Sequence, residues 1–302
     1  MFFLYIEDKK AKNRIGNGGN DMINPNSKII SPKQPYFVLS TSRYYKAIIM
    51  DYGISHFYCF CNEDILGVSA MAVPDGCMDI LFCCDEKNPS ADICGTVLHP
   101  LSAHMKKEKY YFGIRFLPGN ILPFPNIWMK DFIANQVPFL DVVDQKELFE
   151  KITGSRDFNY QIQTFMEFYL TYYEENQNRD KYRNLKNYMI RRINETAGQM
   201  KVNELADETN YSVRYINRIF TEELGISPKV FCKIIRFQDL LSHLNQYEKI
   251  GPDNNLAQIA ITLGYCDQSH MMKDFYELSN TTPGKYLHSL MESEYKNRII
   301  VI

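Results

Sequence analysis

Two cations stand at matching places in two similar stretches of the chain, where each could bind a phosphate or the edge of a base. Arg218 lies six residues after Ser212, and Lys273 lies six residues after Asp267. The two stretches also share an apolar residue at offset four, Phe at eight, a turn former at thirteen, proline at sixteen and an aromatic residue at nineteen: Ile216 and Met271, Phe220 and Phe275, Gly225 and Asn280, Pro228 and Pro283, Phe231 and Tyr286. Six coincident offsets indicate an internal repeat.

Each offset has a role in building a helix that presents its cation. Ser and Asp accept hydrogen bonds from the free N–H groups of a helix's first turn, so both stretches are predicted to begin helices. Residues four and eight positions later share one buried face, which leaves the cation at offset six on the outer face. Gly225 and Asn280 suit the left-handed conformation that ends a helix. The Ser-Pro and Thr-Pro pairs at 227–228 and 282–283 then predict a further helix after each one.

A short helix is predicted before each of these helices, separated from it by a tight turn at 209–211 or at 263–266. A helix, a tight turn and a second helix with a cationic outer face is the helix-turn-helix arrangement, which places its second helix in the major groove of DNA. Apolar spacing predicts one connecting helix over 228–245, about 25 Å long. Such a spacer could hold the two motifs over successive major-groove faces, about 34 Å apart on B-DNA.

Charge and cysteine usage agree with this reading. The net charge of the chain is −2, but residues 181–240 hold eleven basic against seven acidic groups, as a phosphate-facing surface requires. The start MFFLYIEDKK has too short an apolar run for a signal peptide, and no later stretch has the length of a membrane span. We therefore expect a cytoplasmic protein whose eight cysteines stay reduced.

The first half of the chain has a different pattern. Residues 1–35 read as a mobile leader because they are rich in Lys, Asn, Gly and Pro. From 36 to 140, short aromatic and β-branched runs alternate with turn signals, which predicts a sandwich or barrel, and helices follow over 141–180. A DNA-binding domain is expected over 181–290, and a tail over 291–302. The fold class is thus α+β, with an N-terminal β-barrel, trailing helices and an all-α C-terminal domain containing two helix-turn-helix motifs.

Residues 184–290 resemble the AraC/XylS family of bacterial transcription regulators. The resemblance is carried by SVRYINRIFTEELGISP (212–228), by Arg236, and by IAITLGYCDQSHMMKDF (259–275) followed by NTTPGKY. It implies that the DNA bases are contacted by these residues: Arg214, Asn217 and Arg218 in the first motif, and Gln268, Ser269, Met272 and Lys273 in the second. Lys273 replaces a usual Arg and lacks the bidentate fork for guanine. The first motif is therefore expected to dominate affinity.

Residues 73–82 (VPDGCMDILF) and 110–119 (YYFGIRFLPG) resemble the sensory half of a subgroup of these regulators, which implies a cupin-like barrel that receives a small-molecule effector. The resemblance implies double-stranded promoter DNA and RNA polymerase as partners, and a homodimer is expected through the helices at 141–180. We expect no enzymatic activity, cofactor or metal. Activator is the role that the family suggests, although the residues themselves leave activation or repression open.

Several other interpretations compete for the first half. His56, His99 and His104 suggest a metal-dependent cupin enzyme, although no two of them share a strand face at ligand spacing. A dimerisation module without a ligand is a further alternative. The cysteines could sense redox state or simply pack, and the aromatic residues of 36–132, Trp128 included, could line an effector pocket or fill the core. The stripe Phe165, Phe168, Tyr169 and Tyr172 could form a dimer face or the packed side of a helix.

Overall fold

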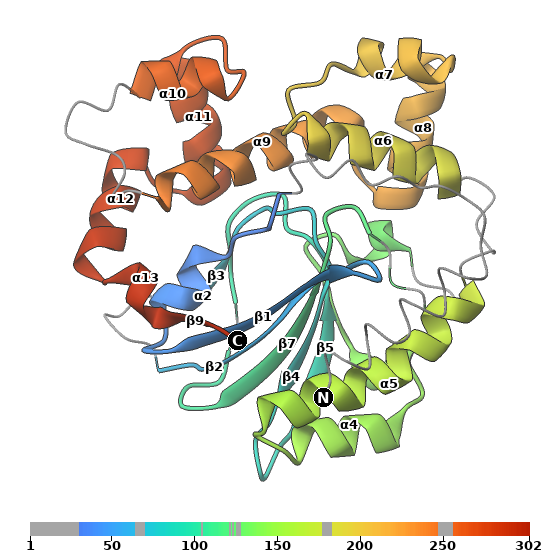
Figure 1. Cartoon of the computed structure of the whole chain (residues 1–302), viewed down its shortest axis with the longest axis vertical. Coiled ribbons are helices and arrows are strands. Elements are labelled where there is room, and N and C mark those ends of the chain that lie inside the picture. Colours follow the sequence, from blue (N-terminus) through green and yellow to red (C-terminus); the bar gives the residue numbers. More distant parts are fainter. Residues whose placement is uncertain are drawn as a thin grey trace.

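The computed structural model describes residues 30–63, 70–103, 105–120, 122, 124, 128–176, 183–246 and 256–302. A sheet-rich N-terminal part carries a helical C-terminal part above it, as Figure 1 shows. The predicted α+β class and its order along the chain are confirmed. Most of the predicted leader lies outside the described residues, and so do residues 177–182, where the segment expected over 141–180 meets the DNA-binding domain.

Seven strands form the main sheet, and two short ones form a second sheet. The order across the main sheet is β8 (Gln136–Pro138), β5 (Ser90–Cys94), β4 (Asp79–Cys83), β7 (Tyr110–Phe116), β2 (Ile54–Cys61), β1 (Tyr44–Asp51) and β9 (Ile299–Val301). All neighbours are antiparallel except β1 and β9. β3 (Met71–Ala72) pairs with β6 (Leu101–Ser102). Among the described strands the main sheet ends at β8 and β9, so hydrogen bonding does not close it into a barrel.

Alternation along the central strands gives the sheet two different faces. Phe57, Ile80 and Phe112 point to one face, which α4 (Lys146–Thr153) and α5 (Phe158–Asn176) cover after the short α3 (Phe139–Val142). Phe165 of α5 contacts Phe57, and both are fully buried. The aromatic stripe of α5 is therefore the packed side of that helix, which leaves the expected dimer face without its proposed surface.

The C-terminal part follows the predicted helix plan. Its helices are α6 (Arg183–Glu195), α7 (Val202–Thr209), α8 (Val213–Leu224), α9 (Pro228–Leu244), α10 (Leu256–Thr262), α11 (Gln268–Ser279) and α12 (Pro283–Glu292). Ser227 and Thr282 cap α9 and α12, each followed by its proline. None of the described helices is long and apolar enough to cross a membrane.

Two boundaries differ from expectation because both ends of the described chain pack on the sheet domain. Ile30 is buried and α2 (Pro35–Leu39) begins within the predicted leader. The expected tail forms α13 (Tyr295–Arg298) and β9, which pairs with β1. Arg298 Nη1 donates to the carbonyls of Leu39 and Thr41. Neither segment could be recognised locally, since both depend on partners far away in the chain.

Candidate nucleic-acid interface

The first motif consists of α7 and α8, and its second helix presents the residues expected to read bases. Ser212 Oγ accepts from Tyr215 N at 3.2 Å, and Gly225 ends α8 with φ +72°. Ile216 and Phe220 are fully buried beneath the helix. The predicted contact residues lie on its other side: Arg214 and Arg218 are exposed, and Asn217 is half-buried.

Two tyrosines on the outer face of this motif were not anticipated from the sequence. The rings of Tyr211 and Tyr215 stack with centroids 4.8 Å apart, and the Arg218 guanidinium lies 4.9 Å from the Tyr215 ring. Stacking on an aromatic face restricts the guanidinium while leaving its N–H groups free for other partners. The sequence signal for this cluster was the spacing of its members: Tyr215 lies three positions before Arg218, and Tyr211 lies four positions before Tyr215.

The second motif, α10 and α11, repeats the construction. Asp267 Oδ1 accepts from His270 N at 2.7 Å, Met271 is fully buried, and Asn280 ends α11 with φ +54°. Met271 and Asn280 thus take the structural places that Ile216 and Gly225 have in the first motif. The expected contact residues are again on the outside: Gln268, Ser269 and Lys273 are exposed and Met272 is half-buried.

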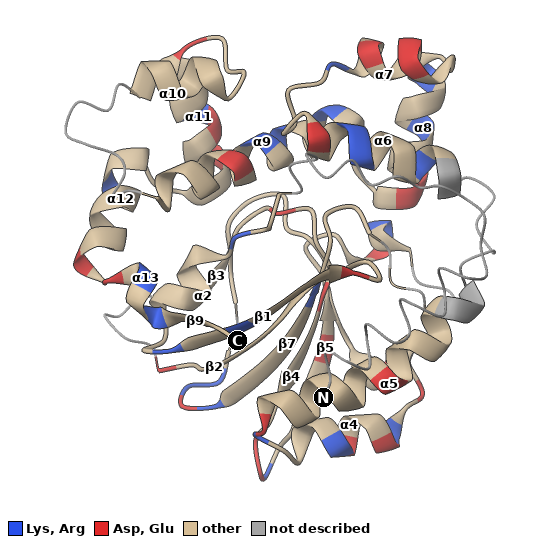
Figure 2. Cartoon of the chain, in the orientation of Figure 1, with Lys and Arg blue, Asp and Glu red and all other residues tan. Residues whose placement is uncertain are grey.

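Acidic side chains make α11 less basic than α8. The carboxylates of Asp274 and Glu277 form ion pairs with Lys233 Nζ of α9, at 3.2 and 2.9 Å. His270 Nε2 lies 3.6 Å from Asp274 Oδ2. Figure 2 shows acidic segments on α11, and basic segments on α6 and α8 beside the acidic segments of α7. The outer face of α8 presents two exposed cations, Arg214 and Arg218, against Lys273 on α11, which favours stronger phosphate attraction at the first motif.

Arg236 of the connecting helix α9 joins the two motifs. Its Nη2 donates at 2.9 Å to the carbonyl of Gly198, which precedes α7, and its Nη1 lies 3.5 Å from the carbonyl of Gly264 in the turn of the second motif. The guanidinium also lies 5.2 Å from the ring of Tyr265. The family residue Arg236 therefore contacts the preceding loop of one motif and the turn of the other, which helps fix their relative placement.

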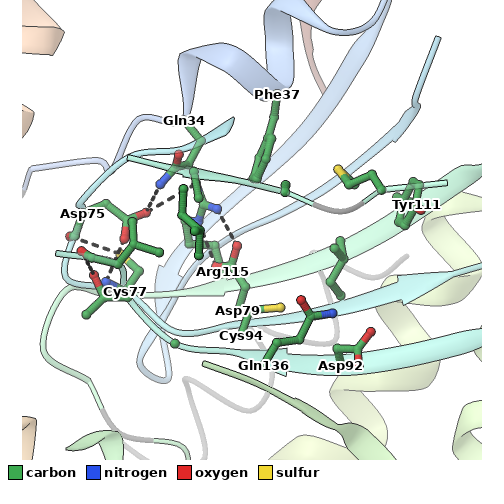
Figure 3. A pocket seen from close by; sticks show the side chains of 18 of the residues that line it. Gln34, Phe37, Asp75, Cys77, Asp79, Asp92, Cys94, Tyr111, Arg115 and Gln136 are labelled. Carbon is green, nitrogen blue, oxygen red and sulfur yellow. Dashed lines mark hydrogen bonds and ion pairs between the residues drawn. The ribbon is translucent and has the colours of Figure 1, made fainter. Parts of the chain in front are cut away.

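A cavity of about 360 Å³ lies on the face of the main sheet that α4 and α5 do not cover. Its volume is in the size range of small-molecule sites. Figure 3 shows its side chains converging from β4, β5 and β7, with Gln34 and Phe37 on the opposite side. Its walls combine apolar groups with buried charges. Trp128, in contrast, is 46% exposed and belongs to the surface.

Arg115 is the central charge of this cavity. Its Nε donates to Asp79 Oδ1 at 2.8 Å, its Nη2 donates to Asp79 Oδ2, and its Nη1 lies 3.7 Å from Asp75 Oδ2. Tyr58 Oη also donates to Asp79, at 2.9 Å. Burial alone would lower the pKa of Arg115, but the two carboxylates outweigh it and hold that pKa above its usual value. Burial raises the pKa of Asp75 despite Arg115.

The competing site types find little support in the described residues. His56 is buried, and its Nδ1 lies 2.9 Å from Ser55 Oγ; burial lowers its pKa, so the ring is neutral. His99 is exposed, and His104 lies outside the described residues. No three His, Cys, Asp or Glu side chains among those described could hold a metal ion. All eight cysteines are free, and burial raises the pKa of Cys59 to about 11 and of Cys84 to about 12, which disfavours reactive thiolates.

Comparisons with known proteins place this geometry in a family context. Residues 205–289 match the family "Helix-turn-helix domain", and residues 51–138 match "Domain of unknown function (DUF6597)". A search of curated proteins gave no match.

Two solved structures are similar at low identity. The C-terminal domain of AraT, a response regulator from Geobacillus stearothermophilus, is 21% identical, covering 35% of this chain and 83% of that one with a TM-score of 0.30. ToxT from Vibrio cholerae is 12% identical, covering 82% of this chain and 97% of that one with a TM-score of 0.38. Because both TM-scores are below 0.5, neither similarity assigns a function. The family match and the two capped motifs together show that residues 205–289 are an AraC-type helix-turn-helix domain.

Proposed function

We propose that this chain is a sequence-specific DNA-binding transcription regulator whose helices α8 and α11 enter the major groove of promoter DNA. The observation that carries the proposal is the repeated motif, in which each second helix is capped at both ends, buried on one side and open on the other. The two helices lie near opposite ends of the connecting helix α9 (Figure 1). This arrangement suits a monomer that reads two half-sites.

The exposed side chains of α8 have the chemistry for base recognition. Arg214 and Arg218 suit the O6 and N7 acceptors of guanine, and Asn217 suits adenine N6 and N7. In the free chain Asn217 Nδ2 donates to the Val213 carbonyl at 2.8 Å, so pairing with adenine requires that bond to be exchanged. On α11, Gln268, Ser269 and Lys273 offer polar contacts, and Met272 offers apolar contact to a thymine methyl.

Selection of bound fragments from random duplex DNA tests the proposal directly. We expect a recovered motif with two conserved blocks separated by about one helical turn, the block for α8 being the better defined. Recovery of no motif from the full chain would contradict sequence-specific binding. A single block would contradict the role of α11.

Replacing Arg218 by alanine is expected to cost about 1–3 kcal/mol of binding free energy at the selected site and to relax preference at one base pair, because the bidentate contact to guanine is lost. Fluorescence anisotropy titration against the selected duplex and its single-base variants measures both effects. Arg156→Ala is the matched control, since Arg156 is exposed in the sheet domain and pairs only weakly, 3.6 Å from Glu86. Equal losses at all sequences would assign Arg218 to phosphate rather than base contact.

The proposal includes an effector that binds the cavity and alters how the sheet domain holds the DNA-binding domain. The support is the loop 73–77, which forms a wall of the cavity and contacts α9 on its other side. Gln238 of α9 is fully buried, and its Nε2 donates to the Pro74 carbonyl at 2.8 Å. Its Oε1 accepts from Lys33 N at 2.7 Å, and the neighbouring Gln34 donates to Asp75 in the cavity.

Two further contacts link the same parts of the molecule. Gly76 approaches Phe231 of α9 so closely that an added Cβ would lie 3.0 Å from its ring. Gly225, at the end of α8, lies against Lys130 of the 3-10 helix η2 (Met129–Phe132). A shift of the loop at 73–77 would therefore displace the first turn of the connecting helix α9, where Phe231 lies.

Coupling of this kind is reciprocal, so DNA should change the loop that faces the cavity. We expect the selected duplex to alter amide hydrogen exchange over 73–79 in the unmodified chain, and Gln238→Leu to reduce that response at least about threefold. The substitution should also cost about 1–3 kcal/mol of stability, because buried backbone groups lose their partner. Gln246→Leu, at an exposed glutamine beyond α9, is the control. An unchanged DNA response in Gln238→Leu would contradict this route.

The same proposal makes four further predictions: contact with RNA polymerase, homodimer formation, an activator role and a cytoplasmic location.

The competing proposal for the first half, a metal-dependent enzyme, is tested by metal analysis of the purified protein. Stoichiometric metal would favour the enzyme, whereas stabilisation by a small molecule would favour the sensor.

A further inference from the structure

The cavity described above has an excess of negative charge that its own cations do not neutralise. Three carboxylates line it, those of Asp75, Asp79 and Asp92, against the two cations Arg115 and Lys106. Lys106 Nζ donates to the carbonyl of Asn88 at 2.9 Å, in an exposed position. The interior therefore holds one guanidinium for three carboxylates.

Arg115 is already engaged by the two aspartates at its end of the cavity. Two of its nitrogens donate to Asp79 and the third faces Asp75. The side chain is 3% exposed and stands beside both carboxylates, so a carboxylate or phosphate that approached it would meet their negative charge at close range. It would also meet the net negative charge of the cavity, which disfavours binding of an anion.

Asp92 is the carboxylate without an ion pair. It lies on β5 directly opposite Leu81 of β4, and two residues before Cys94, which pairs with Gln136 of β8. The side chain of Gln136 is its hydrogen-bond partner, and burial raises the pKa of Asp92. The positive charge of Lys106, which lies in an exposed position, partly offsets this rise in pKa, but among the described residues the two side chains form no ion pair. A half-buried carboxylate of this kind is stabilised by a positive charge brought into the cavity.

The walls near Asp92 combine apolar and aromatic side chains with a few polar ones, Ser90 and Lys106 among them. Leu81, Met105 and Tyr111 line the same cavity, and Figure 3 shows Asp92 and Gln136 side by side at one end, with Tyr111 further along the wall. A metal ion does not fit this end, because no three ligating side chains of the described residues gather there. The volume, about 360 Å³, suits an organic molecule of moderate size.

We propose that the cavity binds a small organic cation, an amine with an apolar body, whose ammonium group pairs with Asp92 while its body lies against Leu81 and Tyr111. The inference rests on the effector role proposed above and names the class of effector. Gln136 positions the carboxylate, and its own side-chain oxygen is an additional acceptor for the ammonium. Arg115, Asp75 and Asp79 form the fixed polar end of the cavity, and this group does not pair with the ammonium of the ligand.

A series of three probes of equal shape tests the charge: 4-phenylbutylamine, 4-phenylbutan-1-ol and 4-phenylbutanoate. Calorimetric titration of the full chain should show the amine binding at least about tenfold more tightly than the alcohol, with the carboxylate weakest. Asp92→Asn, which keeps the shape of the side chain, should weaken amine binding about tenfold or more and leave alcohol binding unchanged. Asp141→Asn, at an exposed aspartate of α3, should leave all three unchanged.

Three results would overturn the assignment: an alcohol or carboxylate that binds as tightly as the amine, an Asp92→Asn variant that keeps full amine affinity, or no binding of any probe. DNA selection with the same protein separates this failure from that of the regulator proposal. A chain that recovers a two-block DNA motif but binds no amine disproves only the effector class. A chain that binds the amine but selects no DNA disproves the regulator.

Discussion

Replacing Arg115 by methionine should lower the free energy of unfolding by about 3–5 kcal/mol, because it leaves two buried carboxylates without their shared cation. Asp75 and Asp79 are both buried, and Asp79 receives two hydrogen bonds from Arg115. Methionine fills much of the side chain's volume, so loss of packing is the smaller part of the effect. Urea unfolding followed by circular dichroism measures the change, with Arg156→Met as the exposed control.

A second substitution shows whether uncompensated charge causes the loss of stability in Arg115→Met. If uncompensated charge is responsible, adding Asp79→Asn to Arg115→Met should restore part of the stability, since one of the stranded carboxylates becomes neutral. The double variant is therefore expected to be more stable than Arg115→Met alone. A double variant that is less stable would show that packing or hydrogen-bond geometry, rather than charge, dominates at this position.

The helical half of the fold could be predicted from the sequence because its determinants are local. Ser212 and Gly225 lie at the two ends of one helix, and each acts within a few residues of itself. Repetition of the same pattern at Asp267 and Asn280 doubled the signal. The exposed positions of Arg218 and Lys273 followed from helical periodicity, whereas Arg214 was named through the family resemblance.

The cavity could not be predicted, because its determinants are pairs of residues far apart in the chain. The segments at 73–82 and 110–119 stood out as motifs but suggested no ligand. In the structure they meet: Asp75 and Asp79 come from the first and Arg115 from the second, across the register of β4 and β7. Likewise, Gln238 bonds with Pro74, 164 positions away. Strand register and domain docking decide such contacts, and neither has a local sequence signal.

Ile216→Asp should abolish folding of the first motif and cost about 4 kcal/mol or more of stability. Ile216 is fully buried one turn after the Ser212 cap, so the substitution removes apolar packing and places an unpaired carboxylate in the core of the motif. Binding to the α8 block of the selected DNA should then be lost. Circular dichroism melting and anisotropy titration on single-block duplexes measure the two effects separately.

Val213→Asp is the control for this substitution, because it places the same charge on the same helix at a position that is 37% exposed. An aspartate in the first turn of a helix interacts favourably with the helix dipole, so its stability should stay within about 0.5 kcal/mol of the unmodified chain. Equal losses in both variants would mean that α8 does not bury the face on which Ile216 lies. The outer face, with Arg214 and Arg218, would then be wrongly assigned, because the two faces are fixed by one periodicity.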